Sequence, residues 1–151
     1  MSVHRAEVRW SAVGDFPAGR YSRAHEWHFD GGAVVPASAS PGAVPAPWSD
    51  PGAVDPEEAL VAAVSSCHML WFLDLARRAA LDVLSYQDVA EGTLGKGADG
   101  RVAITRVTLA PQIAFAAEPD PGVVERLHAE AHERCFIANS LRGEVVLARQ
   151  R

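Results

Sequence analysis

Cysteine, lysine and long apolar runs are all scarce in this chain. Its 151 residues include two cysteines, Cys67 and Cys135, and a single lysine, Lys96. Residues 1–16 carry charges where a signal peptide needs an apolar core, and no apolar run approaches the roughly 18 residues of a membrane span. These absences predict a cytoplasmic protein with no membrane partner. In that compartment two cysteines are not expected to form a standing structural disulfide, so the pair is inert, metal-binding or redox-active.

Positive charge and several catalytic motifs are missing as well. The net charge is −5, without the basic stripe that a nucleic-acid partner requires. No G-x-S-x-G motif is present, so a serine hydrolase is not indicated. No glycine-rich phosphate loop is present either, and no cofactor is predicted. The length fits one domain over residues 1–151 with a core of its own.

The pattern of elements predicts an α+β fold in the order ββ–α–ββ–α–β. Strand-like segments with alternating apolar residues are distinct from segments with a helical pattern. The proline-rich segment 33–54 fits neither, and we expect it to be a long ordered loop. The expected strands are residues 3–13, 23–29, 83–93, 101–115 and 143–149, and the expected helices are residues 55–80 and 122–134.

The first helix has a strong start signal and an unusual composition. Asp55 suits the N-cap, Pro56 the first turn, and Glu58 the partner position of a capping box. Its centre, residues 59–75, is apolar on nearly every side. Such a helix is expected to be buried all round, either wrapped by antiparallel sheets or shared with a second subunit.

Cys67 lies in the middle of this helix, in the stretch VAAVSSCHMLWF (residues 61–72). A buried, inert cysteine is the commoner case. A working thiolate needs a positive neighbour, and His68 points about 100° away around the helix. If Cys67 is reactive, its cation must come from another element. Arg20, Arg23 and His25 are the candidates, on or near the first hairpin.

Two further groups allow a functional and a plain interpretation. His128, His132 and Cys135 have the spacing H-x3-H-x2-C, which permits a metal site, but histidines on a helix face with a partly buried cysteine are the simpler alternative. Glu57 and Glu58 need no function beyond capping the helix.

Two motifs nevertheless resemble those of the OsmC/Ohr family of osmotically inducible and organic hydroperoxide resistance proteins. DPEEALVAAVSSC (residues 55–67) is similar to the family's P-E-[EQ]-L-x-x-A-x-x-x-x-C helix start. HERCFIANSLRGEVVL (residues 132–147) is similar to its second-cysteine segment. The separation of the two cysteines and the order of elements also match, over essentially the whole chain.

The resemblance implies a thiol peroxidase with an OsmC-like fold that acts in oxidative-stress defence. By position, Cys67 is the peroxidatic cysteine and Cys135 the resolving cysteine. Glu57 and an N-terminal arginine, Arg23 in preference to Arg20, hold the thiolate and polarise the peroxide. The implied partners are an organic hydroperoxide and a dithiol reductant such as a lipoylated protein. The hairpin lacks the family's G-R-D-G pattern and Phe136 replaces a proline, which indicates a divergent branch.

Helix geometry adds a prediction of its own. Ten residues separate Glu57 from Cys67, or about 15 Å along one straight helix. The two cannot flank one peroxide unless the helix breaks or a second subunit contributes. We therefore expect an intertwined homodimer with its sites at the subunit boundary. The alternative function is a non-catalytic protein that binds a hydrophobic ligand there, against residues 69–72.

Overall fold

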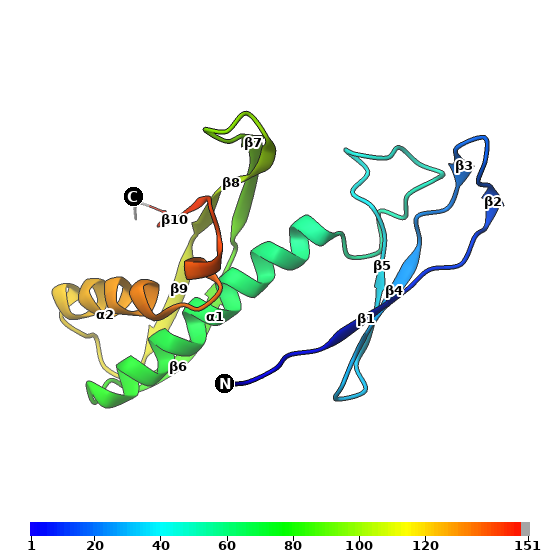
Figure 1. Ribbon diagram of the computed structural model, residues 1–151. Coiled ribbons are helices and arrows are strands. Elements are labelled where there is room, and N and C mark those ends of the chain that lie inside the picture. Colours follow the sequence, from blue (N-terminus) through cyan, green and yellow to red (C-terminus); the bar gives the residue numbers. More distant parts are fainter. Residues whose placement is uncertain (149–151) are drawn as a thin grey trace. The chain divides into compact units, whose positions relative to one another are not determined.

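The computed structural model describes residues 1–148, which form two compact units, Met1–Ala59 and Leu60 onward (Figure 1). The N-terminal unit holds five short strands and the first turn of helix α1 (Pro56–Arg78). The C-terminal unit holds the rest of α1, a second helix, a 3-10 turn and five strands. The elements are β1 (Ala6–Arg9), β2 (Gly14–Asp15), β3 (Arg20–Tyr21), β4 (His25–Phe29), β5 (Val34–Ala37), α1 (Pro56–Arg78), β6 (Val83–Asp88), β7 (Glu91–Lys96), β8 (Val102–Leu109), β9 (Pro111–Phe115), α2 (Pro121–Arg134), η1 (Ala138–Ser140) and β10 (Glu144–Leu147).

The N-terminal unit contains an antiparallel sheet in the order β1-β4-β5 and a separate hairpin, β2-β3. The first predicted strand is too long, because only Ala6–Arg9 pairs with β4. The predicted loop 33–54 is wrong at its start, where Val34–Ala37 forms β5. Pro36 is tolerated there because β5 lies at the edge of the sheet, where a missing N–H need not break the ladder.

The rest of the proline-rich segment is an ordered loop, as predicted. Its two ends are joined by backbone bonds from Ser38 N to Val54 O and from Val54 N to Pro36 O, each 3.0 Å. The hydroxyl of the fully buried Ser38 also accepts the N–H of Asp50 at 2.9 Å. These bonds close the loop at its base.

The start of α1 agrees with its sequence signal. The Glu58 N–H donates to Asp55 Oδ1 at 2.8 Å, and the Asp55 N–H donates to Glu58 Oε2 at 3.2 Å. This reciprocal pair is the predicted capping box. At the other end of the helix, the Asp74 carboxylate accepts from Arg77 and Arg78.

The C-terminal unit is built from α1, α2 and two sheets, β10-β8-β7 and β6-β9. Strand β10 is parallel to β8, whereas the other pairs are antiparallel. Two predicted strands are each divided in the structure, 83–93 into β6 and β7, and 101–115 into β8 and β9. Asp88 is involved in both divisions. It is the last residue of β6, and its carboxylate accepts the N–H of Ala110, between β8 and β9, at 2.7 Å.

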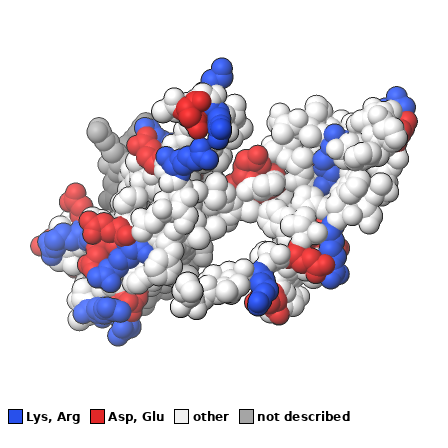
Figure 2. Space-filling model, in the orientation of Figure 1, with Lys and Arg blue, Asp and Glu red and all other residues white. Residues whose placement is uncertain are grey.

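The hydrophobic core consists of two clusters, and α1 supplies side chains to both. One cluster joins Phe72, Leu75 and Ala76 of α1 to Leu127 and Ala131 of α2. The other joins Val64 of α1 to Val107 and Leu109 of β8. The surface near the C-terminal half of α1 and α2 carries interspersed acidic and basic side chains (Figure 2), including the pairs Asp74–Arg78 and Glu130–Arg134.

Helix α1 is buried along one face rather than all round within this chain. Its buried residues are Val64, His68, Phe72, Leu75 and Ala76. It is also long and apolar enough to cross a membrane by length and composition, with a mean hydropathy of 1.6 over 18 residues. The expectation that no segment approaches a membrane span is therefore wrong for this helix. A helix that packs into a protein core passes the same test.

The structure confirms the predicted α+β class, with two helices and several antiparallel sheets. The two helices agree with their predicted bounds to within two residues. The last strand was expected to run to Arg149, which lies outside the described residues. The single-domain assignment and the homodimer stay predictions.

Candidate active site

Cys67 and Cys135 lie close together in the C-terminal unit, although many residues separate them in the chain. Cys67 is half-buried in the middle of α1, and Cys135 is fully buried at the C-cap of α2. The two side chains are near enough that Cys67 raises the pKa of Cys135. Both thiols are free. The two predicted redox residues are thus neighbours in the fold.

The surroundings of Cys135 favour its protonated thiol. Burial raises its pKa, the backbone N–H of Ala138 opposes that effect, and the contact with Cys67 raises the pKa further. The N–H of Ala138 donates to Cys135 Sγ at 3.4 Å. Cys135 is therefore expected to need deprotonation before it attacks another sulfur.

The turn after Cys135 is held together by its own hydrogen bonds. Helix α2 ends because Cys135 adopts an extended backbone with ψ 106°. The Asn139 N–H then donates to Cys135 O at 3.0 Å, and the Ser140 hydroxyl donates to Phe136 O at 2.8 Å. The segment 135–140 is thus a compact unit that carries Cys135.

His68 does not serve Cys67, in agreement with the helical geometry. Its ring is 1% exposed, and its Nε2 lies 3.0 Å from Nδ1 of His128 on α2. Burial, with a smaller contribution from His132, lowers the pKa of His68 to about 4, and Asp88 opposes this shift. Burial likewise lowers the pKa of His128 to about 4, so the pair is uncharged at neutral pH. Sequence reasoning missed this pair because no local pattern connects two helices.

Two of the three residues of the proposed metal spacing have other partners. His128 is hydrogen-bonded to His68, and Cys135 Sγ accepts the N–H of Ala138 and lies close to Cys67. Within residues 1–148, no three histidine, cysteine or acidic side chains are grouped so that they could hold a metal ion. The arrangement favours the simpler interpretation of this spacing.

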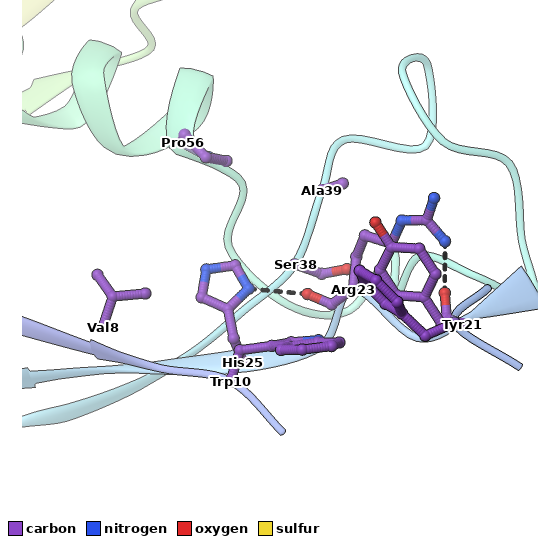
Figure 3. A pocket seen from close by; sticks show the side chains of 9 residues that line it. Val8, Trp10, Tyr21, Arg23, His25, Ser38, Ala39 and Pro56 are labelled. Carbon is purple, nitrogen blue, oxygen red and sulfur yellow. Dashed lines mark hydrogen bonds between the residues drawn. The ribbon is translucent and has the colours of Figure 1, made fainter. Parts of the chain in front are cut away.

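Arg23 lines an apolar pocket of the N-terminal unit, with a volume of about 380 Å³ (Figure 3). Its guanidinium carbon lies 3.6 Å from the centre of the Tyr21 ring. The rings of Trp10, Phe16 and Tyr21 pack together there, with centroid distances of 4.7 to 5.7 Å. The pocket therefore combines an aromatic wall with one cation.

His25 fixes the backbone at Arg23. The indole N–H of Trp27 donates to His25 Nε2 at 3.0 Å, which makes Nε2 the acceptor. The proton on Nδ1 then donates to Arg23 O at 2.8 Å, as the dashed line in Figure 3 shows. Arg20, by contrast, is exposed and paired with Asp15 at 3.0 Å. These contacts favour Arg23 over Arg20 as a preorganised cation.

Glu57 is half-buried in the first turn of α1, directly after Pro56 of the pocket wall. The cap is made by Glu58, not by Glu57. Among the hydrogen bonds and ion pairs of residues 1–148, none involves the Glu57 carboxylate. Capping therefore accounts for one acid of the pair and leaves the other available. Helix α1 is unbroken between Glu57 and Cys67, so the two stay about 15 Å apart along its axis.

Solved structures with this fold include proteins named for hydroperoxide resistance. An organic hydroperoxide resistance protein from Elizabethkingia anophelis is 18% identical with a TM-score of 0.68, and 99% of each chain is covered. The organic hydroperoxide resistance protein OhrB of Bacillus subtilis is 23% identical with a TM-score of 0.63, over 95% of this chain and 94% of that one. At these identities the likeness shows the fold alone.

A nearer relative and a family model define the family. An OsmC-like protein of unknown function from Vibrio cholerae is 49% identical with a TM-score of 0.95, over 98% of this chain and 99% of that one. The model of OsmC-like proteins matches residues 49–148. The chain belongs to the OsmC-like family. No curated protein sequence matches it.

Proposed function

We propose that the protein is a cysteine-based peroxidase that reduces organic hydroperoxides. The observation that carries the proposal is that Cys67 and Cys135 lie close together inside the OsmC-like fold. A half-buried thiol next to a fully buried one suits a peroxidatic and a resolving cysteine.

The proposed cycle has three balanced steps. The Cys67 thiolate attacks the distal peroxide oxygen, the O–O bond breaks, and the alkoxide leaves and takes up a proton to become an alcohol. Cys67 is now a sulfenic acid, and the Cys135 thiolate attacks its sulfur, so that a disulfide forms and hydroxide leaves to become water. A dithiol reductant then restores both thiols and becomes a disulfide itself.

Arg23 and Glu57 are proposed to act on the peroxide from a second copy of the chain. The continuous α1 separates Glu57 from Cys67 by about 15 Å, which one helix cannot close around a single peroxide. A homodimer that brings the Arg23 pocket of one copy to Cys67 of the other removes this conflict. Sedimentation at micromolar concentration tests the dimer, and a monomer would overturn it.

The decisive experiment compares the wild type with Cys67→Ser. The wild type is expected to consume cumene or tert-butyl hydroperoxide with dithiothreitol present, and Cys67→Ser is expected to lose this turnover. One equivalent of peroxide should lower the intact mass by about 2 Da, for the two hydrogens lost in a 67–135 disulfide. Retained turnover in Cys67→Ser would overturn the proposal. The setting of this chemistry is proposed to be the cytoplasm.

A second candidate is a non-catalytic protein that binds a hydrophobic ligand. The pocket of about 380 Å³ favours it, because its wall is largely aromatic and apolar. An apolar molecule that copurifies, together with thiols that stay reduced under peroxide, would support this alternative.

A further inference from the structure

Trp71 contacts the residues on both sides of Cys135. The guanidinium carbon of Arg134 lies 5.6 Å from the centre of the Trp71 ring. The ring of Phe136 meets the same indole edge-on, with centroids 5.6 Å apart and an interplanar angle of 84°. Both are recognised attractive geometries, a cation over an aromatic face and a T-shaped aromatic pair. We call Trp71, Arg134 and Phe136 the Trp71 clamp.

The clamp lies beside the two cysteines. Cys67 and Trp71 are four residues apart on α1, so their side chains are neighbours on one helix face. On the opposing segment, Cys135 lies close to Cys67 while Phe136 contacts Trp71. The aromatic contact therefore joins α1 to the end of α2 directly beside the two cysteines.

Phe136 is an aromatic residue on the surface, so the burial of its side chain is not what holds it beside Trp71. Its side chain is 68% exposed, whereas the preceding Cys135 is fully buried. Its ring instead packs edge-on against Trp71. On the far side of Cys135, Ile137 packs against the cluster of Val64, Val107 and Leu109. The compact segment 135–140 is thus fixed to the body from two sides, by Ile137 and by the clamp.

We propose that the Trp71 clamp positions Cys135 for disulfide formation with Cys67. A disulfide forms without strain only when the Cβ atoms lie about 3.8 Å apart and the torsion about the S–S bond is near 90°. The clamp restricts how far Cys135 moves while both thiols are reduced, so less freedom is lost when the bond forms. Arg134 and Phe136 are positioning residues, because they act through Cys135 and not on the substrate.

This inference rests on the proposed function, but it is tested without peroxide. Glutathione disulfide oxidises the cysteine pair directly: two thiols become one protein disulfide, and one glutathione disulfide becomes two glutathione thiols. The full-length protein is equilibrated at a series of glutathione ratios, the exchange is stopped with acid, and the oxidised fraction is read from the intact mass by mass spectrometry. The midpoint gives the equilibrium constant for the 67–135 disulfide.

Phe136→Ala is expected to lower this constant by roughly three- to tenfold, the range that a lost aromatic pair corresponds to. Phe136→Tyr keeps the ring and is expected to restore the wild-type value. Phe29→Ala removes an equally apolar exposed ring from β4 and serves as the matched control, with no change expected. Because Phe136 is mostly exposed, its removal should lower the urea midpoint of the reduced protein only slightly, by no more than the loss of one aromatic pair.

A double-mutant cycle with Trp71→Leu checks that the effect passes through the indole. In the Trp71→Leu background, Phe136→Ala should have little further effect on the constant. An unchanged constant in Phe136→Ala overturns the clamp while leaving the peroxidase proposal intact. A wild type that forms no 67–135 disulfide at any glutathione ratio overturns the proposed function instead.

Discussion

His68 and His128 stack in parallel at the contact between α1 and α2. Their rings are 5.3 Å apart and inclined by 8°, and Nε2 of His68 lies 3.0 Å from Nδ1 of His128. Phe72 stacks on the other side of His128 at 4.3 Å. His68 Nδ1 is buried without a hydrogen-bond partner among the described residues. The pair therefore occupies the core in its uncharged form, and protonation has no ready partner there.

This pair predicts acid sensitivity between about pH 6.5 and pH 4. Burial lowers the pKa of both rings to about 4 in the folded chain, while the unfolded chain titrates near 6.5. In that window the unfolded state binds more protons, so the stability is fully present above pH 6.5 and falls as the pH drops towards 4. For each histidine, the free energy of unfolding falls by about 1.4 kcal/mol per pH unit in this window, so the pair loses several kcal/mol in total. Urea unfolding at a series of pH values from 4 to 7.5 measures this loss.

The control for this prediction replaces the pair with apolar groups. His68→Leu combined with His128→Leu should flatten the dependence of the unfolding free energy on pH, because neither ring then titrates. Asp88, the acid that raises both histidine pKa values, stays in place. The exposed His4→Gln should leave the dependence as in the wild type. An equally steep dependence in the double variant would show that other groups are responsible.

Arg23 should prove necessary for peroxide turnover, and Arg20 should not. Arg23 is stacked 3.6 Å over Tyr21 in the pocket, whereas Arg20 is exposed and paired with Asp15. Because a lost preorganised donor costs about a hundredfold or more in rate, Arg23→Met should lower kcat/KM for cumene hydroperoxide by that order. Arg23→Lys keeps the charge but not the planar stacking, and should be impaired by at least about tenfold. Arg20→Lys should keep a kcat/KM close to that of the wild type. If the Arg20 variant were impaired and the Arg23 variants were not, Arg20 would be the arginine of the site.

The disulfide-forming step should accelerate as the pH rises above neutral. Burial raises the pKa of Cys135, so only a small fraction is thiolate at pH 7. The rate of the attack on oxidised Cys67 follows that fraction and should rise about tenfold per pH unit below the pKa. Rapid mixing with one equivalent of peroxide, followed by acid quench and mass spectrometry, measures disulfide formation. In Cys135→Ser the sulfenic acid should persist, and a pH-independent rate in the wild type would contradict the prediction.

The sequence predicts those features that depend on neighbouring residues. The start of α1 follows from Asp55 and Glu58, since both partners of the capping box lie within one turn. The cysteine pair is suggested by the family motifs, which encode a contact that spacing alone does not. Strand β5 is missed because Pro36 argues against a strand unless its edge position is known.

Features that depend on tertiary contacts are out of reach of local patterns. The His68–His128 bond joins residues on two helices that lie far apart in the chain. The Trp71 clamp likewise depends on how α1 meets the end of α2. The divisions between β6 and β7, at residues 89–90, and between β8 and β9, at Ala110, contain no glycine that would mark them in the sequence. The division at Ala110 is explained by a tertiary contact, the hydrogen bond from its N–H to Asp88.

Asp88 should be a strong determinant of stability, because one carboxylate joins three elements. At the end of β6, it accepts the Ser65 hydroxyl of α1 through Oδ2 and the N–H of Ala110, between β8 and β9, through Oδ1. Asp88→Ala leaves that N–H without its acceptor and should cost about 2 to 3 kcal/mol of unfolding free energy. Asp88→Asn keeps an oxygen for Ala110 and should lose less, whereas Ser65→Ala removes only the donor on α1 and should lose least. Urea unfolding at pH 7.5 compares the three variants at a pH where the buried histidines are uncharged, and equal losses would show that the bond to Ala110 is not the main one.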